Sequence, residues 1–181
     1  MQFLLKLSRW IDRLSELMGW LTVGFTLVMV AVGAYNAIVR YLGRYIGVNL
    51  SSNLYIDVQW YLFSLVFLLG AGYVLKRNEH VRVDILYSRF SAKGKAIVNL
   101  LGGLFLLIPL CVVIWFYSLP AVINSWRVLE QSSNASGLPI YPIKTAILIA
   151  FTLLALQGFS EIIKQLAVLL NNNGTTSEVS Q

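Results

Sequence analysis

The chain contains few of the residues that most enzymes use for chemistry. It has one cysteine, Cys111, and one histidine, His80, among 181 residues. A single cysteine cannot form an internal disulfide, and one histidine cannot supply two ligands to a haem. P-loop, HExxH, paired-cysteine and GxSxG patterns are absent as well, which excludes the common nucleotide-binding and hydrolase motifs. We therefore expect no catalytic residue, no metal site and no cofactor, and we interpret Cys111 as a structural thiol.

Charged residues are also scarce. They make up 12% of the chain, whereas soluble domains contain about a quarter, and 57% of the residues are hydrophobic. The net charge of +6 would suggest a nucleic-acid partner if the basic residues gathered on a polar domain. Here they flank long apolar blocks instead, which is typical of a membrane protein whose partner is the lipid bilayer. We expect no nucleic-acid partner.

Four apolar runs are long enough to cross about 30 Å of hydrocarbon. We predict spans at about 17–39, 58–75, 96–120 and 143–169, within a single membrane domain over residues 1–170. Ser51 or Ser52 is expected to cap the second of these helices. The third run continues without charge to Trp126, so we expect a kink at Pro109 and an exit near Pro120. The Asn/Thr/Ser-rich tail 171–181 is predicted to be disordered.

The first sixteen residues mix charged and apolar side chains at helical spacing. One face of the predicted helix carries Leu4, Leu5, Leu7, Ile11, Leu14 and Leu17. Its bases, Lys6, Arg9 and Arg13, lie elsewhere, as in helices that rest on the membrane surface. The predicted fold class is an all-α integral membrane protein with four transmembrane helices and an N-terminal interfacial amphipathic helix.

Basic residues are concentrated between the second and third spans. This loop and its borders contain Lys76, Arg77, Arg82, Arg89, Lys93 and Lys95. Because basic loops stay in the cytoplasm, the loop and the basic N-terminus are predicted to be cytoplasmic. An even number of spans then returns the C-terminus to the same side. Arg40 and Arg44 oppose this assignment, but they are fewer.

Several polar residues fall within or at the ends of spans. Asn36 and Arg40 are four residues apart and share a helix face. They are candidates for binding carbonyls of a partner helix; alternatively, Arg40 extends to lipid headgroups and Asn36 meets a neighbouring hydroxyl. Gln157 and Glu161 also share a face, which we expect to meet protein rather than lipid, with a proton relay as the alternative. Lys144 is expected to extend outward.

Asp57 precedes the second span. We interpret it as an anion stabilised by the dipole of a helix N-terminus, in preference to an ion-binding residue.

Short stretches in order along the chain carry a family resemblance. They are Asn36 with Arg40-Tyr41, Trp60, Gly70-Ala71 with Lys76-Arg77, His80-Val81-Arg82-Val83-Asp84, Ser133–Ser136 with Gly137-Leu138-Pro139, Pro142-Ile143-Lys144, and Gln157 with Glu161. Together they resemble the small membrane subunit, of the DctQ type, of tripartite ATP-independent periplasmic (TRAP) transporters. The most specific are the His80–Asp84 run and the run from Gly137 to Lys144. One departure is Asp57, near which the resemblance leads us to expect a glutamate.

The resemblance implies a three-part complex in the bacterial inner membrane. A soluble periplasmic binding protein would capture a small organic acid, and a large multispan subunit would import it with a sodium gradient. This chain would brace the large subunit without holding substrate or sodium. His80, Arg82 and Asp84 would then clasp the large subunit; alternatively, their loop is solvated and only sets topology. The candidate interface or topology residues are Asn36, Arg40, Trp60, His80, Arg82, Asp84, Lys144, Gln157 and Glu161.

Two other functions are compatible with four plain spans. One is the membrane anchor of a quinone- or haem-linked redox enzyme, whose ligands would have to come from another chain because His80 lies outside the spans. The other is a small stand-alone channel. A haem absorption band would favour the first, and ion flux through the isolated chain would favour the second.

Overall fold

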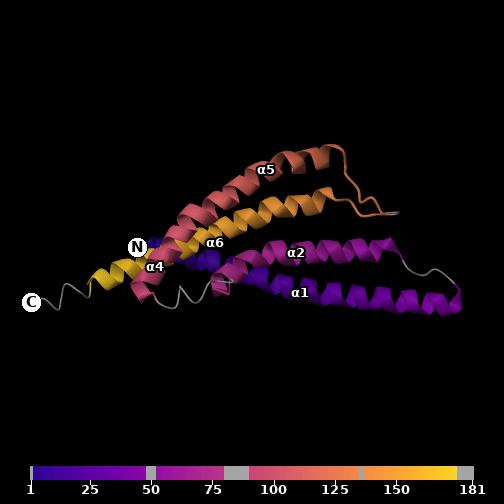
Figure 1. The fold of residues 1–181 in the computed structure, drawn as a ribbon, viewed down its shortest axis with the longest axis horizontal. Coiled ribbons are helices and arrows are strands. Elements are labelled where there is room, and N and C mark those ends of the chain that lie inside the picture. The colour runs from indigo at the N-terminus through magenta and orange to yellow at the C-terminus, as the bar shows by residue number, and fades with distance from the viewer. Residues whose placement is uncertain (1, 48–51, 80–89, 135–136, 175–181) are drawn as a thin grey trace, which may run out of the picture.

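The computed structural model describes residues 2–47, 52–79, 90–134 and 137–174. These residues form helices joined by short connections (Figure 1). The elements are α1 (Gln2–Ile46), α2 (Asn53–Arg77), α4 (Ala92–Gly102), the π-helix η1 (Gly103–Leu107), α5 (Ile108–Arg127) and α6 (Tyr141–Gly174). Ser52 caps α2, because its hydroxyl accepts a hydrogen bond from the amide of Leu54 at 3.2 Å, which confirms one of the two predicted caps.

Four helical rods are long and apolar enough to cross a membrane. They are α1, α2, the continuous run α4–η1–α5, and α6. Each of the four spans predicted from the sequence lies within one of these rods. The prediction of an all-α protein with four membrane-spanning helices is therefore confirmed.

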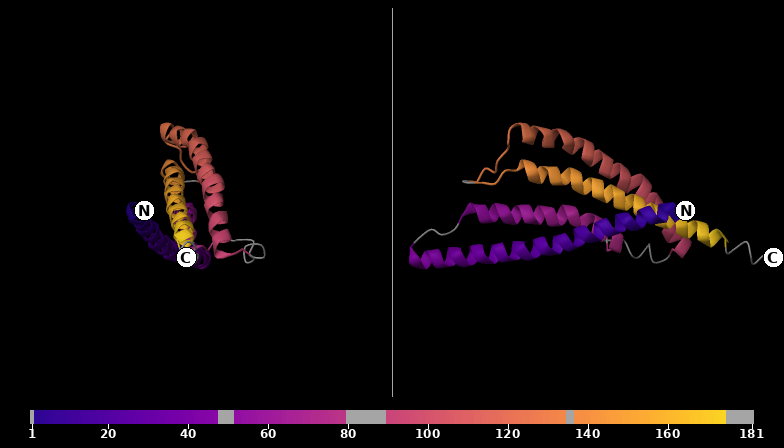
Figure 2. Two further views of the ribbon diagram at one scale, coloured as in Figure 1. Left: turned by 90° about the vertical axis from the view of Figure 1, so that its left-hand side faces the viewer. Right: turned by 180° about the vertical axis from the view of Figure 1, so that it is seen from behind.

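Helix α6 is the centre of the bundle. It contacts α1, α2, α4 and α5, while α1 packs along α2. An end-on view shows α6 between α1 and the α4–α5 rod (Figure 2, left). The N-terminus and the end of α6 lie toward the same end of the bundle (Figure 1). We call this the terminal end, and the end that carries residues 128–140 the loop end.

The interior of the bundle is made of small and polar side chains. Buried residues include Ala96, Cys111, Ala146, Ala150, Ser8, Ser125 and Ser160. Many large apolar side chains point outward, among them Trp20, Phe67, Phe105 and Tyr117. This distribution suits lipid, where large apolar groups gain little by leaving the hydrocarbon and small residues let helices approach closely. Cys111 is buried at one of these helix contacts, at 2% exposure.

The N-terminal segment is helical but is not a separate element. Residues 2–16 form the first turns of α1, a single helix of 45 residues that contains no proline. Its buried face consists mainly of Ser8, Ile11, Ser15 and Gly19, whereas Leu4, Leu7 and Leu17 are exposed. The helix therefore continues into the bundle on its small and polar face. A position at the membrane surface stays a prediction for these residues.

The third rod has its irregularity next to Pro109. The π-helix Gly103–Leu107 widens the turn that leads into α5, and the amide of Ile108 bonds to the carbonyl of Gly103. Proline has no N–H to offer the preceding turn, and π-turns accommodate such a defect without ending a helix. The helix also passes through Pro120 and ends at Arg127. An exit from the membrane near Pro120 stays a prediction.

Glycine allows α6 to approach this rod closely. A Cβ added to Gly158 would lie 2.8 Å from Cδ2 of Leu107, and one on Gly103 would lie 3.1 Å from Cγ1 of Ile162. Glycines on both helices thus hold the π-turn against α6.

Candidate functional site

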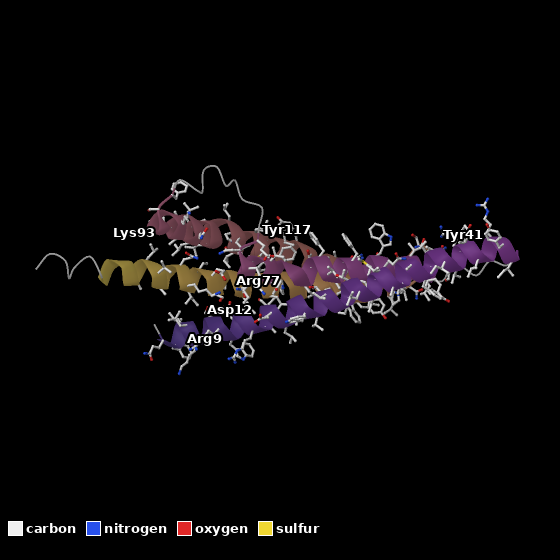
Figure 3. The ribbon with its side chains drawn as sticks, turned by 90° about the horizontal axis from the view of Figure 1, so that it is seen from below. Arg9, Asp12, Tyr41, Arg77, Lys93 and Tyr117 are labelled. Carbon is white, nitrogen blue, oxygen red and sulfur yellow. The ribbon has the colours of Figure 1, made fainter. Side chains whose placement is uncertain are left out.

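Polar side chains gather between α1 and α6 near the terminal end. We call this group the terminal cluster; it consists of Ser8, Asp12, Ser15, Gln157, Ser160, Glu161 and Lys164. Its members recur every three or four residues on each helix, which places them on one face of α1 and one face of α6. Among the labelled side chains, Asp12 lies near the crossing of these helices (Figure 3).

Gln157 is the centre of the terminal cluster and is completely buried. Its Oε1 accepts a hydrogen bond from the hydroxyl of Ser15 at 2.7 Å. Its Nε2 donates to Asp12 Oδ1 at 3.0 Å and to Glu161 Oε1 at 3.1 Å. Both polar atoms of this buried amide are thus bonded within the chain.

Lys164 neutralises part of the acidic charge in the terminal cluster. Its Nζ lies 2.8 Å from Asp12 Oδ2 and 2.8 Å from Glu161 Oε1. Ser160 donates a further hydrogen bond to Asp12 at 2.9 Å and meets the hydroxyl of Ser8 at 2.7 Å. Paired charges and satisfied hydroxyls are what a polar group needs within a membrane bundle. The chemistry of the cluster is therefore to fasten α1 to α6.

Helix α2 joins this end through a salt bridge and through small residues. Lys76 Nζ lies 3.0 Å from Glu16 Oε2. A Cβ on Gly19 would lie 2.5 Å from the ring of Tyr73, and one on Gly72 would lie 3.5 Å from the hydroxyl of Ser15. Gly19 is thus needed for the close approach of α1 and α2, and Gly72 lies at an ordinary contact with α1. Helices α1, α2 and α6 therefore pack together at this end.

A second polar group connects α2 to residues 128–140. The carboxylate of Asp57 is 4% exposed; it accepts hydrogen bonds from Asn134 Nδ2 at 2.6 Å and from the amide of Leu138 at 3.2 Å. The hydroxyl of Tyr61, one turn further along α2, donates to the carbonyl of Pro139 at 2.6 Å. We call Asp57, Tyr61, Asn134, Leu138 and Pro139 the loop clasp.

The loop itself is held in a hairpin-like shape. The amide of Ile140 donates to the carbonyl of Glu130 at 2.8 Å, and that of Ser132 donates to Leu138 at 3.0 Å. A Cβ on Gly137 would lie 2.5 Å from Cβ of Ser132, so only glycine fits the Gly137-Leu138-Pro139 run as it stands. The run thus presents the Leu138 amide and the Pro139 carbonyl to α2.

The loop clasp corrects the interpretation of Asp57. Asp57 is the fifth residue of α2, beyond the first turn where the helix dipole acts, and its carboxylate binds the loop. A signal was present in the sequence: Asp57 and the Gly137–Pro139 run both lie at the ends of spans that face the same side. Nothing in the residue pattern showed that they meet.

Lys144, which is predicted from the sequence to extend outward at the start of the fourth span, is paired within the chain. Its ammonium donates to the carboxylate of Glu130, which also accepts from the hydroxyl of Ser125 at 2.6 Å. These two hydrogen bonds hold the pKa of Glu130 below the ordinary glutamate value. The bond from Lys144 has the larger effect. The pair anchors the start of the loop to the start of α6.

The remaining predicted residues fall into two groups. Asn36, Arg40 and Trp60 line a groove of about 610 Å³ between α1 and α2, and the Trp60 side chain is 65% exposed. His80, Arg82 and Asp84 lie outside the described residues. The structure therefore brings Asn36 and Arg40 together with Trp60, and it places Gln157 and Glu161 in the separate terminal cluster.

Comparison with known families decides the class. Residues 29–168 match the family described as "Tripartite ATP-independent periplasmic transporters, DctQ component". The chain belongs to the DctQ family. The match begins inside α1 and ends inside α6, so it covers α2, the α4–η1–α5 rod and the loop clasp in full and parts of α1 and α6. No curated protein and no solved structure matches the chain.

Membership of the DctQ family makes the protein a transporter component and not an enzyme, as predicted. It also argues against the redox-anchor alternative.

Proposed function

We propose that this DctQ protein is the non-catalytic small permease subunit of a TRAP transporter. In this proposal it braces a large multispan subunit that imports a small organic acid with a sodium gradient, after delivery by a periplasmic binding protein. The family match over residues 29–168 is the observation that carries the proposal.

The contacts within the bundle support a bracing role. The terminal cluster fastens α1 to α6 at one end. At the other end, the loop clasp fastens α2 to Asn134, Leu138 and Pro139. Polar groups in both are engaged with one another rather than arranged along a path through the bundle. A subunit tied at both ends is suited to stay fixed while a neighbouring subunit moves.

The distribution of bases supports an inner-membrane topology with cytoplasmic termini. Near the terminal end lie Lys6, Arg9, Arg13, Lys76, Arg77, Lys93, Lys95 and Lys164, whereas Arg40, Arg44, Arg127 and Lys144 lie toward the loop end. Figure 3 shows Arg9 and Lys93 toward one end of the bundle and Tyr41 at the other. By the positive-inside rule, the terminal end faces the cytoplasm and the loop end the periplasm.

Two measurements on one affinity-tagged chain test the proposal. Isolation from native membranes in mild detergent is expected to recover a much larger multispan protein together with this chain. Liposomes that contain only the tagged chain are expected to show no solute or ion flux, while the recovered complex with its periplasmic binding protein transports an organic acid when sodium is supplied outside. Flux through the isolated chain, or a haem band in its visible spectrum, would overturn the proposal.

A further inference from the structure

One buried polar atom in the described part of the bundle has no partner. The Asn36 side chain is 9% exposed, and its Oδ1 receives no hydrogen bond. An amide oxygen in a membrane bundle has no bulk water to bond with, so it needs a donor from elsewhere. Among the described residues, Asn36 is therefore the buried position at which a hydrogen-bond donor is missing.

Two adjoining hollows meet at Asn36 between α1 and α2. The first, of about 610 Å³, and the second, of about 390 Å³, share Asn36, Arg40 and Gln59. We call them together the α1–α2 groove. Its other lining residues are Met29, Val30, Gly33, Ala37, Tyr41, Arg44, Ile56, Trp60 and Phe63.

The α1–α2 groove changes in chemistry along its length. Met29 and Val30 lie about 15 Å deeper along α1 than Arg40, at 1.5 Å per residue, and Phe63 lies deeper along α2 than Trp60. The deep part is thus apolar, and the part toward the loop end is cationic. Trp60, at its rim, is of the type that occupies the headgroup level of membranes.

The cations of the groove have no acidic partner within the described chain. The ion pairs found there use Lys76, Lys144 and Lys164, and none involves Arg40 or Arg44. The two acids toward this end are engaged elsewhere: Asp57 binds the loop, and Glu130 binds Lys144. Both arginines are exposed. The part of the groove toward the loop end therefore carries positive charge that an anion can neutralise.

We propose that the α1–α2 groove binds one phosphatidylglycerol-type lipid. Its phosphate pairs with Arg40 and Arg44, and an acyl chain lies along the deep apolar part. A headgroup hydroxyl, folded back beside the phosphate, donates to Asn36 Oδ1 once the buried amide turns toward the groove. The two positive charges favour an anionic headgroup over a zwitterionic one. The unpartnered acceptor favours a headgroup that carries a donor. One phosphatidylglycerol molecule supplies the anionic group, the hydrogen-bond donor and the apolar chain.

Three lipids that differ in charge and in hydroxyl groups test the two contributions to binding on the unaltered protein. Phosphatidylglycerol carries both the negative charge and the hydroxyls, phosphatidylmethanol carries the charge alone, and phosphatidylcholine has neither net charge nor donor. Titration of each lipid onto the full chain in detergent, read by native mass spectrometry, counts the lipids retained. We expect one retained phosphatidylglycerol, bound about tenfold or more tightly than phosphatidylcholine, with phosphatidylmethanol between them.

Three variants assign the contacts. Arg40→Gln with Arg44→Gln is expected to lower the binding of both anionic lipids to the phosphatidylcholine level. Asn36→Leu is expected to lower phosphatidylglycerol binding to the phosphatidylmethanol level and to leave phosphatidylmethanol unchanged. Arg127→Gln, an exposed base on α5 outside the groove, is the matched control and should change neither. Circular dichroism checks that each variant keeps its helix content.

Equal retention of the three lipids by the unaltered chain would overturn the proposal, and so would an equal loss in the Arg127→Gln control. A photoreactive residue at Ala37 gives an independent arm in the assembled complex. It is expected to label lipid; labelling of a polypeptide there would show that a partner subunit, not a lipid, fills the groove.

Discussion

Single residues hold this bundle together through polar bonds that pass between helices. Gln157 is the central example, because its one amide contacts Ser15 and Asp12 on α1 and Glu161 on its own helix. The spacing of Gln157 and Glu161 in the sequence predicts that they share a face that meets protein. It does not identify Asp12 or Ser15 as their partners, because helical periodicity describes each helix separately and does not tell which helices are neighbours.

Replacement of Gln157 by leucine should therefore weaken the packing of α1 on α6. Bonds between helices average about 0.6 kcal/mol each in membranes, so the loss of the two that reach α1 is expected to lower the free energy of unfolding by about 1 kcal/mol. Thermal unfolding in detergent measures this. Thr152→Val on the same helix is the control, because that exposed hydroxyl bonds only to the carbonyl of Leu148 within α6. Equal midpoints for the two variants would contradict the assigned role.

Glu130 gives the loop end a dependence on pH. Its folded pKa lies below the ordinary value because Lys144 and then Ser125 donate to the ionised form. The stabilisation by this carboxylate is thus present above the ordinary glutamate pKa and is lost as the pH falls through the lower, folded pKa. Carbon NMR of the labelled carboxyl should show a midpoint below the ordinary value, and Lys144→Met should raise it. A midpoint unaffected by Lys144→Met would show that the ion pair does not form.

At the scale of elements, hydropathy predicted the four rods well, since a span must exceed a minimum apolar length. The details that depend on contacts between elements were missed. The continuity of α1 through residues 2–46 accompanies the packing of Ser8 and Ser15 on α6, which the periodicity of one helix does not reveal. The loop clasp was missed for the same reason, because Asp57 is 77 residues away from Asn134 in the chain.

The loop clasp should protect the Leu138 amide, which it holds against Asp57, from exchange. Asp57→Asn removes the negative charge and replaces one acceptor oxygen by a donor that faces the Leu138 amide or the Asn134 amide. We expect the Leu138 amide to exchange with deuterium about tenfold faster or more, which is the equivalent of about 1.4 kcal/mol. Ser64→Ala on the same helix is the control, since its hydroxyl bonds only to the carbonyl of Trp60. Unchanged exchange at Leu138 would argue against the clasp.

The run His80–Asp84 is the element on which the resemblance depends most and which lies outside the described residues. If it clasps the large subunit, Arg82→Ala or Asp84→Ala should reduce the yield of the complex several-fold in a pull-down, because each removes one half of a charge-assisted contact. Arg89→Ala removes a base from the same loop outside the run and should have little effect. A normal yield in both test variants would leave the run as a topology signal, with the family assignment unaffected.

At the scale of the whole molecule, an even number of rods places the start of α1 and the end of α6 at one end of the bundle (Figure 1). Reporter fusions test which side that is. A fusion at Arg89 or at the C-terminus is expected to be active only with a cytoplasmic reporter, and a fusion within residues 128–134 only with a periplasmic one. The basic residues of the terminal end are the physical reason. A periplasmic signal from the Arg89 fusion would reverse the assignment.

The unbroken length of α1 has a consequence for what lies outside the lipid. At 1.5 Å per residue, its 45 residues extend about 68 Å, more than twice the hydrocarbon thickness. Even at a steep tilt of about 40°, roughly 39 Å of helix suffices to cross the hydrocarbon. About 29 Å of the same rigid rod must therefore stand in the headgroup layers or in water, where it offers soluble neighbours a surface that moves as one piece with the buried core.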